Sequence, residues 1–212
     1  MKLDPGVLRP MEAYKLMIGA IVPRAIAWVS TVGENGVLNL APFSFFTGVC
    51  SEPPIVCFCP VLRMGQKKDT LRNVEYSEEF VVNIVNEELA ERMNITSTDF
   101  PPEISEFERT GLTPVASEKV KPPRIGESPI SMECKLVQIV YLGGQTMGGC
   151  VVLGQVVQFH IKDELHYDTA KIDQHKLRAI GRMAGDMYCR TSDIFEMKRP
   201  RYVPSEGAGK PS

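Results

Sequence analysis

The feature that most restricts the fold is a series of strand-like segments joined by connections of only a few residues. Parallel strands need a crossover of about a dozen residues or more, so segments this close together must pair as antiparallel neighbours. The connection at 33–36 contains Asn35-Gly36, the strongest short signal for a β-hairpin turn. The predicted strands in this part of the chain are 25–32, 37–41, 44–50 and 55–59.

Three further segments complete the predicted sheet. Residues 80–85 form a short β-rich run, and 130–142 and 150–162 form two long ones around the glycine-rich connection 143–149. Helical patterns are inserted between some strands and do not alternate with each of them. The sequence therefore predicts a mainly β fold with inserted helices, in which an antiparallel sheet closes into a barrel. The number of helices excludes a pure β-sandwich.

Helix signals occur at five places. Asp69 is predicted to cap a helix over 70–77. Ser105 and Glu108 have the spacing of a capping box that starts a helix, and Gly111 is predicted to end that helix. The other predicted helices cover 10–18, 87–95 behind a cap at Asn86, and 173–180. The proline-containing segment 115–129 is predicted to be mostly loop.

The chain is long enough for one sizeable core. It has 212 residues, of which 43% are hydrophobic, and a chain of this size buries about 70% of its unfolded surface. This length allows one or two domains, and all-β folds often reach this size as one, so we expect a single domain over residues 1–203. The remaining residues, 204–212, are rich in Gly, Pro and Ser and are expected to be a disordered tail.

Charge and hydropathy restrict the partners and the location. The formal net charge is −2 at pH 7, so no general basic field favours nucleic acid or an anionic membrane surface. The first residues contain no apolar core of a secretory signal, and no apolar run approaches the ~20 residues of a membrane span. We expect a cytoplasmic protein that binds neither nucleic acid nor membranes.

The six cysteines do not form a disulfide or metal pattern. None is part of a C-x-x-C pair, and Cys57 and Cys59 lie on one side of a predicted strand. They are interpreted as small buried hydrophobic residues in a reducing cytosol. A zinc site would need help from the histidines at 160, 166 and 175, which are better interpreted as ordinary surface or turn residues.

Common catalytic and nucleotide-binding motifs are missing from the sequence. No G-x-G-x-x-G follows a strand, and the tail segment 207–210 lacks the spacing of a P-loop. There is also no G-x-S-x-G and no H-E-x-x-H. A hydrolase with its own nucleophile and base therefore has no support.

Two stretches combine aromatic, small polar and proline residues on extended chain. The first, P-R-A-I-A-W-V-S-T at 23–31, places the only tryptophan beside Ser and Thr. The second, N-L-A-P-F-S-F-F at 39–46, interrupts a strand with proline next to aromatic side chains. Each of them alone could be ordinary core packing.

Two later stretches carry charge at places where the backbone turns. K-D-T-L-R-N at 68–73 starts a helix, where outward-pointing N–H groups and the helix dipole favour an anion. Lys68 and the Thr70 hydroxyl would complete a phosphate site there, and Asp69 is interpreted as the cap or as an acceptor for a ring N–H. G-R-M-A-G-D-M-Y at 181–188 places Arg and Tyr on a flexible turn after a helix, where they could close over a planar ligand. A capped helix and a C-capping turn are the structural alternatives.

The order and spacing of these four stretches resemble the flavin reductase-like FMN-binding family, close to its flavoredoxin members. The similarity extends from about Tyr14 to Tyr188. Two positions differ from the family pattern: Ala25 stands where a second proline is usual, and Ala184 replaces the first of two glycines.

The resemblance implies a split β-barrel of Greek-key type and a homodimer that holds FMN in clefts at the subunit interface. The positions that correspond to flavin-binding residues of the family are Trp28, Ser30, Thr31, Pro42, Ser44, Phe45, Thr47, Lys68, Asp69, Thr70, Arg182 and Tyr188. Hydride transfer to a flavin needs stacking and distance control but no protein nucleophile, so no catalytic side chain is expected.

The function implied by the resemblance is transfer of reducing equivalents from NADH or NADPH, as a transient partner, to flavin. The reduced flavin would then serve a partner monooxygenase or another electron acceptor. Three alternatives stay open: a flavoredoxin-like electron carrier with tightly held FMN, a barrel without cofactor that acts as an interaction module, and a pyridoxamine-phosphate oxidase-like activity. The second and third stretches do not favour the last of these.

Overall fold

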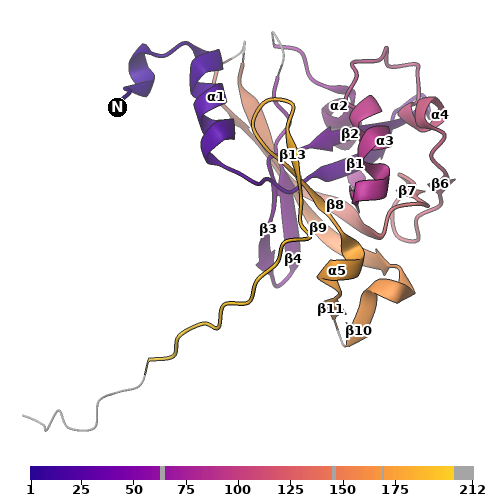
Figure 1. The fold of residues 1–212 in the computed structure, drawn as a ribbon. Helices are drawn as coiled ribbons and strands as arrows, with labels where there is room; N and C mark the ends of the chain where they lie inside the picture. The colour runs from indigo at the N-terminus through magenta and orange to yellow at the C-terminus, as the bar shows by residue number, and fades with distance from the viewer. Residues whose placement is uncertain (63–64, 145–146, 169, 203–212) are drawn as a thin grey trace, which may run out of the picture.

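The structure is a computed structural model that describes residues 1–62, 65–144, 147–168 and 170–202. The predicted tail 204–212 and part of the predicted connection 143–149 therefore lie outside the described residues. A seven-stranded antiparallel sheet in the order β2–β1–β5–β8–β9–β4–β3 forms the body of the protein (Figure 1). Its strands are β1 (Ala27–Val32), β2 (Leu38–Phe43), β3 (Phe46–Ser51), β4 (Pro54–Phe58), β5 (Glu79–Ile84), β8 (Ile130–Leu142) and β9 (Gly149–Ile161).

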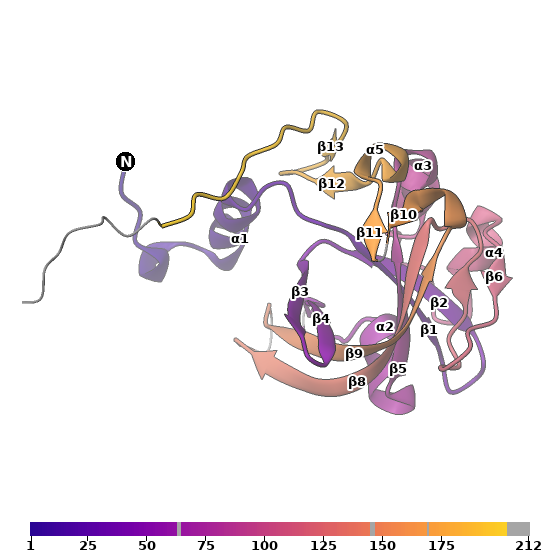
Figure 2. The ribbon, with the colours of Figure 1, turned by 90° about the horizontal axis from the view of Figure 1, so that it is seen from below.

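The sheet curls on itself because its two edge strands are neighbours in the chain. Strands β2 and β3 lie at opposite edges of the sheet, yet only Ser44 and Phe45 separate them. The carbonyl of Phe45 accepts a hydrogen bond from the backbone N–H of Cys59, at 2.9 Å, just after β4. Figure 2 shows the resulting curvature from β3 round to β2. The sequence prediction of an antiparallel sheet that closes toward a barrel is confirmed.

Shorter elements surround the sheet. The helices are α1 (Pro10–Ala20), α2 (Asp69–Ser77), α3 (Ala90–Ile95), α4 (Glu106–Thr110) and α5 (Gln174–Leu177), with 3-10 turns η1 (Pro5–Val7), η2 (Glu87–Leu89) and η3 (Asp163–Leu165). The described residues also form two-stranded ladders: β6 (Pro114–Val115) with β7 (Arg124–Ile125), β10 (His166–Asp168) with β11 (Lys171–Ile172), and β12 (Ile180–Arg182) with β13 (Tyr188–Arg190). No helix in the described part of the chain is long and apolar enough to cross a membrane.

Two apolar clusters lie on the two faces of the sheet. The cluster inside the curved sheet contains Phe58 and Phe80, whose ring centroids are 5.3 Å apart, and the α2 residues Leu71 and Val74. Gly154 has no room for a side chain, because a Cβ there would lie 2.2 Å from the ring of Phe80. In the second cluster, the strand residues Trp28 and Leu40 are buried together with side chains of three other elements: Met93 of α3, Phe107 of α4 and Ile180 of β12.

The N-terminal helix and the end of the described chain stand apart from this body. Helix α1 has no buried residue, although it carries Met11, Leu16 and Met17. Residues 191–202 are exposed throughout and have no helix or strand. Figure 2 shows both segments outside the barrel. Their apolar side chains thus have little to pack against within one chain.

Most predicted helices exist, but their caps and lengths differ from the prediction. The N-cap of α2 is Lys68 and not Asp69, whose carboxylate turns to Arg72 instead. Ser105 precedes α4 without making a side-chain capping bond, so the predicted capping box is wrong, whereas Gly111 does end α4 in the left-handed region.

Two other helix predictions need correction. The predicted helix over 87–95 is a 3-10 turn followed by α3, and Asn86 makes no side-chain cap. The predicted helix over 173–180 shortens to α5, which Asp173 does cap. Ile180 is not helical and begins strand β12 instead. Its backbone N–H donates to the carbonyl of Val85, which lies just after strand β5.

Candidate functional site

A cleft of about 330 Å³ opens at the start of α2. Pro42 of strand β2 lines one side, and Lys68, Asp69 and Thr70 line another. The segment 96–100, which follows α3, closes the third side. The structure thus brings the second and third sequence stretches together in one concave site.

The N-terminus of α2 opens onto the cleft. No side chain among the described residues caps this nine-residue helix; the carbonyl of its N-cap, Lys68, accepts from the N–H groups of Leu71 and Arg72. The first N–H groups of a helix have no partner within the helix, and the helix dipole favours negative charge near them. This end of α2 has the properties of an anion site.

The cations at this helix end are held by neighbouring carboxylates. Lys68 Nζ lies 3.4 Å from Asp99 Oδ1, and Lys67 Nζ lies 2.6 Å from Glu75 Oε1. The guanidinium of Arg72 bonds to Asp69 and, at 2.6 Å, to the carbonyl of Lys67. A bound anion would therefore compete with Asp99 for Lys68.

Asn39 connects the helix start to the strand that carries Trp28. Its amide nitrogen donates to Thr70 Oγ1 at 2.9 Å and to Thr31 Oγ1 at 3.1 Å. Asn73 of α2 donates to the same Thr31 oxygen at 3.0 Å. Asn39 heads the second sequence stretch but was not among the predicted site residues.

Trp28, Ser30 and Thr31 of strand β1 are fully buried. The indole N–H of Trp28 donates to Thr96 Oγ1 at 2.8 Å, and Thr96 lines the cleft. Ser30 donates to the carbonyl of Pro123 at 2.6 Å. None of the three exposes surface in this chain, and their direct contact with a ligand stays a prediction.

The remaining predicted residues lie outside this cleft. Ser44 and Phe45 form the β2–β3 connection, and Thr47 is exposed on β3. Arg182 and Tyr188 face each other across the β12–β13 pair, with the guanidinium carbon 4.4 Å from the ring centroid. They stand on paired strands, so the predicted flexible turn after a helix is wrong for these two positions.

Arg24 connects these outlying residues. Its Nε lies 3.4 Å from Ser44 Oγ, and its Nη2 donates to the carbonyl of Met183, at 2.9 Å, in the β12–β13 connection. It belongs to the first sequence stretch, but the sequence offers no signal that the charged residue there is buried. The first, second and fourth stretches meet at this side chain.

Glu106 is a further polar residue in the cleft that sequence reasoning missed. It lines the cleft from α4 and accepts a 2.9 Å hydrogen bond from the N–H of Leu40. Burial raises the pKa of its carboxyl group above the usual value. The cleft therefore holds an acidic group that resists ionisation next to Lys68.

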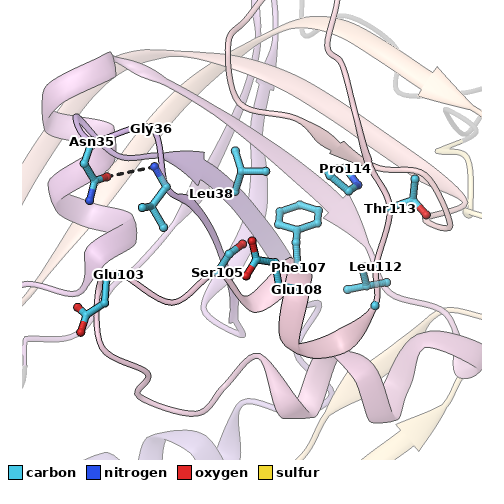
Figure 3. A pocket seen from close by; sticks show the side chains of 12 residues that line it. Asn35, Gly36, Leu38, Glu103, Ser105, Phe107, Glu108, Leu112, Thr113 and Pro114 are labelled. Atoms are coloured by element: carbon cyan, nitrogen blue, oxygen red, sulfur yellow. Dashed lines mark hydrogen bonds between the residues drawn. The ribbon is translucent and has the colours of Figure 1, made fainter.

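A pocket larger than this cleft lies elsewhere and contains no predicted residue. It measures about 660 Å³ and is formed by the β1–β2 turn and helix α4, with Leu38, Phe107 and Leu112 on its apolar side (Figure 3). The charged side chains that line it are Glu103 and Glu108, and its described lining residues include no Lys or Arg to balance them, unlike the cleft at α2, so it would repel a phosphate. This pocket therefore does not suit the phosphate-bearing ligand that the four stretches predict.

The cysteines and histidines do not assemble into a metal centre in the described residues. All six cysteines are free, and burial raises the pKa of the Cys134 thiol. His160 is not the surface residue that was predicted, because its Nε2 lies 2.6 Å from an oxygen of the fully buried Glu133. His166 and His175 are exposed.

Residues 18–180 match the family model described as a flavin reductase like domain. A protein of Aquifex aeolicus (strain VF5) is 43% identical over 186 residues, which cover 87% of this chain and 93% of that protein. The crystal structure of nitrilotriacetate monooxygenase component B from Bacillus cereus superposes with a TM-score of 0.89 at 36% identity, and the match covers 93% of this chain and 98% of that one.

Two more distant structures show the fold alone. A Shewanella frigidimarina NCIMB 400 protein with a split barrel domain has a TM-score of 0.79 at 22% identity, with 96% and 100% of the two chains covered. Flavoredoxin of Desulfovibrio vulgaris (Miyazaki F) has a TM-score of 0.72 at 20% identity, with 99% and 100% covered. The predicted split β-barrel with inserted helices is confirmed.

Proposed function

The chain belongs to the family of flavin reductase-like domains, and from that premise we propose that it binds FMN and passes reducing equivalents from NADH or NADPH to the flavin. The observation that carries the proposal is the cleft at the start of α2. Pro42, Lys68, Asp69 and Thr70 line it together, although the family resemblance selected them from separate parts of the sequence.

The residues present fit a flavin mononucleotide. Its phosphate suits the open end of α2, where Lys68 and the first N–H groups can bind it. Its ring would extend from Pro42 toward Ser44 and Phe45, which supply an apolar wall with polar edges. When bound, the flavin supplies the hydride-accepting chemistry, and the side chains of the protein bind and orient it.

A nicotinamide would bind only transiently, over the exposed face of the ring. The sequence contains no Rossmann fingerprint, so a permanent dinucleotide site of that type is not expected. Positioning of the two rings, and not a protein nucleophile, would control the reaction.

We propose that the working form is a homodimer. Helix α1 exposes Met11, Leu16 and Met17, and the segment 191–202 exposes Phe195 and Met197. Large exposed apolar patches mark interaction sites, and a second copy would cover these segments and close the flavin cleft. Light scattering during size-exclusion chromatography tests this: a mass of twice 23.6 kDa supports it, and a monomer contradicts it.

The proposed acceptor of the reduced flavin is a partner monooxygenase. The Bacillus cereus structure is a monooxygenase component, and its 36% identity over nearly the whole chain supports the comparison. The cytoplasm is the proposed location, which the free cysteines fit.

Steady-state NADH and NADPH oxidation with excess free FMN tests the activity. Sustained turnover supports a reductase. A single slow reduction of bound FMN, without turnover, would instead indicate a flavoredoxin-like electron carrier. A purified protein that takes up no FMN on titration would contradict both functions.

A further inference from the structure

Arg24 is a buried cation at the junction of three elements. The residue is only 6% exposed. Its Nη1 donates to the carbonyls of Ile18 and Ile21, at 2.7 and 2.8 Å, near the C-terminal end of α1. Its other nitrogens reach Ser44 Oγ and the carbonyl of Met183. One guanidinium thus joins α1, the β2–β3 connection and the β12–β13 pair.

Arg182 brings a second positive charge to the same place. The backbones of Arg24 and Arg182 exchange two hydrogen bonds, at 2.9 and 2.8 Å. The side chain of Arg182 is three-quarters buried and stacks on Tyr188. Its ionic partner, Asp186, is 3.9 Å away and fully exposed, so water screens that pair.

The charge at this junction is not balanced within the described chain. The partners of Arg24 are carbonyls and a hydroxyl, and no carboxylate among the described residues pairs with it. A helix C-terminus contributes about half a negative elementary charge. Asp186 adds one negative charge near Arg182, but it is fully exposed and screened by water. The two guanidinium groups therefore keep a positive excess at this junction, and the buried charge of Arg24 has no carboxylate counter-charge among the described residues.

This positive region lies next to the ring end of the proposed flavin site. Pro42 lines the cleft that holds the phosphate, and Ser44 follows two residues later. Two residues of extended chain span at most about 7 Å. The Arg24 guanidinium also lies 5.8 Å from the centroid of the Phe45 ring.

Resting on the proposed function, we infer that the positive charges of Arg24 and Arg182 together stabilise the reduced form of the flavin ring. A hydride from the nicotinamide adds two electrons and one proton to a neutral ring, so the ring gains one negative charge. Positive groups held near the ring favour that charge. Arg24 is thus a positioning and electrostatic residue that the family resemblance did not select.

The test measures the flavin midpoint potential in the full-length protein. It compares a variant at the phosphate end of the proposed site with variants at the ring end. The phosphate has the same charge in both redox states, so Lys68→Ala should weaken oxidised and reduced FMN equally and leave the midpoint potential unchanged. Arg182→Gln and Arg24→Gln should weaken the reduced form about tenfold more than the oxidised form. For a two-electron couple this lowers the potential by about 30 mV.

Arg24→Lys keeps the charge while it loses the forked geometry, and it should retain most of the wild-type potential. If Arg24→Gln fails to fold, Arg182→Gln carries the test alone. Wild-type potentials in the foldable glutamine variants would overturn the inference and leave flavin binding intact. A wild-type protein that binds no FMN would remove the proposed function and this inference with it.

Discussion

The amide nitrogen of Asn39 lies 2.9 Å from the hydroxyl oxygen of Thr70 and 3.1 Å from that of Thr31. This single side chain fixes the start of α2 against strand β1, and all three residues are almost completely buried. The geometry of the cleft therefore depends on a small polar cluster and not only on the apolar cores on either side of the sheet.

Replacing Asn39 by Ala should destabilise the protein and widen the cleft. The change removes two buried hydrogen bonds, each worth about 0.5–1.5 kcal/mol. We expect the free energy of unfolding in urea to fall by about 1–3 kcal/mol, with weaker FMN binding. Asn73→Ala is the matched control, because it removes one bond to Thr31 and none to Thr70. An equal loss of FMN affinity in both variants would argue against a special role for Asn39.

Replacing Asp99 by Asn should strengthen FMN binding. Asp99 holds Lys68 in an ion pair of 3.4 Å between partly exposed side chains, and a phosphate must compete with it. Exposed pairs of this kind are worth about 0.2–1 kcal/mol, so the gain in affinity should be of that size. Fluorescence titration measures it, and unchanged or weaker binding would show that Lys68 does not meet the phosphate.

Glu106 should make the stability depend on pH. Burial raises the pKa of its carboxyl above the usual 4.5 in the folded state. Between the unfolded and folded values the folded state holds more protons, so this group reduces stability as the pH rises through that window. Glu106→Gln keeps an acceptor for Leu40 and removes the ionisation. Thermal melts should show a higher melting temperature than wild type at pH 8, and a smaller difference at pH 4. The reverse order would contradict the assignment.

Gly154→Ala should disturb the core of the barrel. The added Cβ would lie 2.2 Å from Phe80 Cζ and 3.3 Å from Cys134 Cβ, where the core has no room for it. Overpacking of this type costs about 1–3 kcal/mol. Gly48→Ala on β3 is the control, since nothing lies within 4 Å of the added atom. Chemical unfolding of both variants tests the difference, and equal stabilities would refute it.

The sequence predicted the strands well because their connections are short and chemically distinctive. The Asn35-Gly36 turn and the two long strands β8 and β9 leave few alternatives to antiparallel pairing. Helix caps were predicted less well. Asp69 has the right residue type for a cap, but its carboxylate pairs with Arg72, and the cap position falls to Lys68.

The site was predictable in part. Spacing indicated that Lys68 and Thr70 start a helix, and the family motif added Pro42 from a separate strand. The burial of individual side chains was not predictable from the motif, because its residue types do not show whether Trp28 and Arg24 face solvent or the core. The charge balance around Arg24 depends on two contacts that the sequence does not reveal. One is with Ile18 of α1, a helix without a recognised motif, and the other is with Met183, which is distant in the sequence.

Titration of FMN into the purified protein, followed by flavin fluorescence and the visible spectrum, tests the central claim most directly. We predict saturable uptake by the wild type. Lys68→Ala should lose about 1–3 kcal/mol of binding free energy, the scale of a charge-assisted hydrogen bond. Lys171→Ala, which changes a lysine on β11 away from the cleft, should bind like the wild type. Absence of uptake by the wild type, or equal affinity in the wild type and Lys68→Ala, would contradict the assignment of the cleft at α2 as the flavin phosphate site.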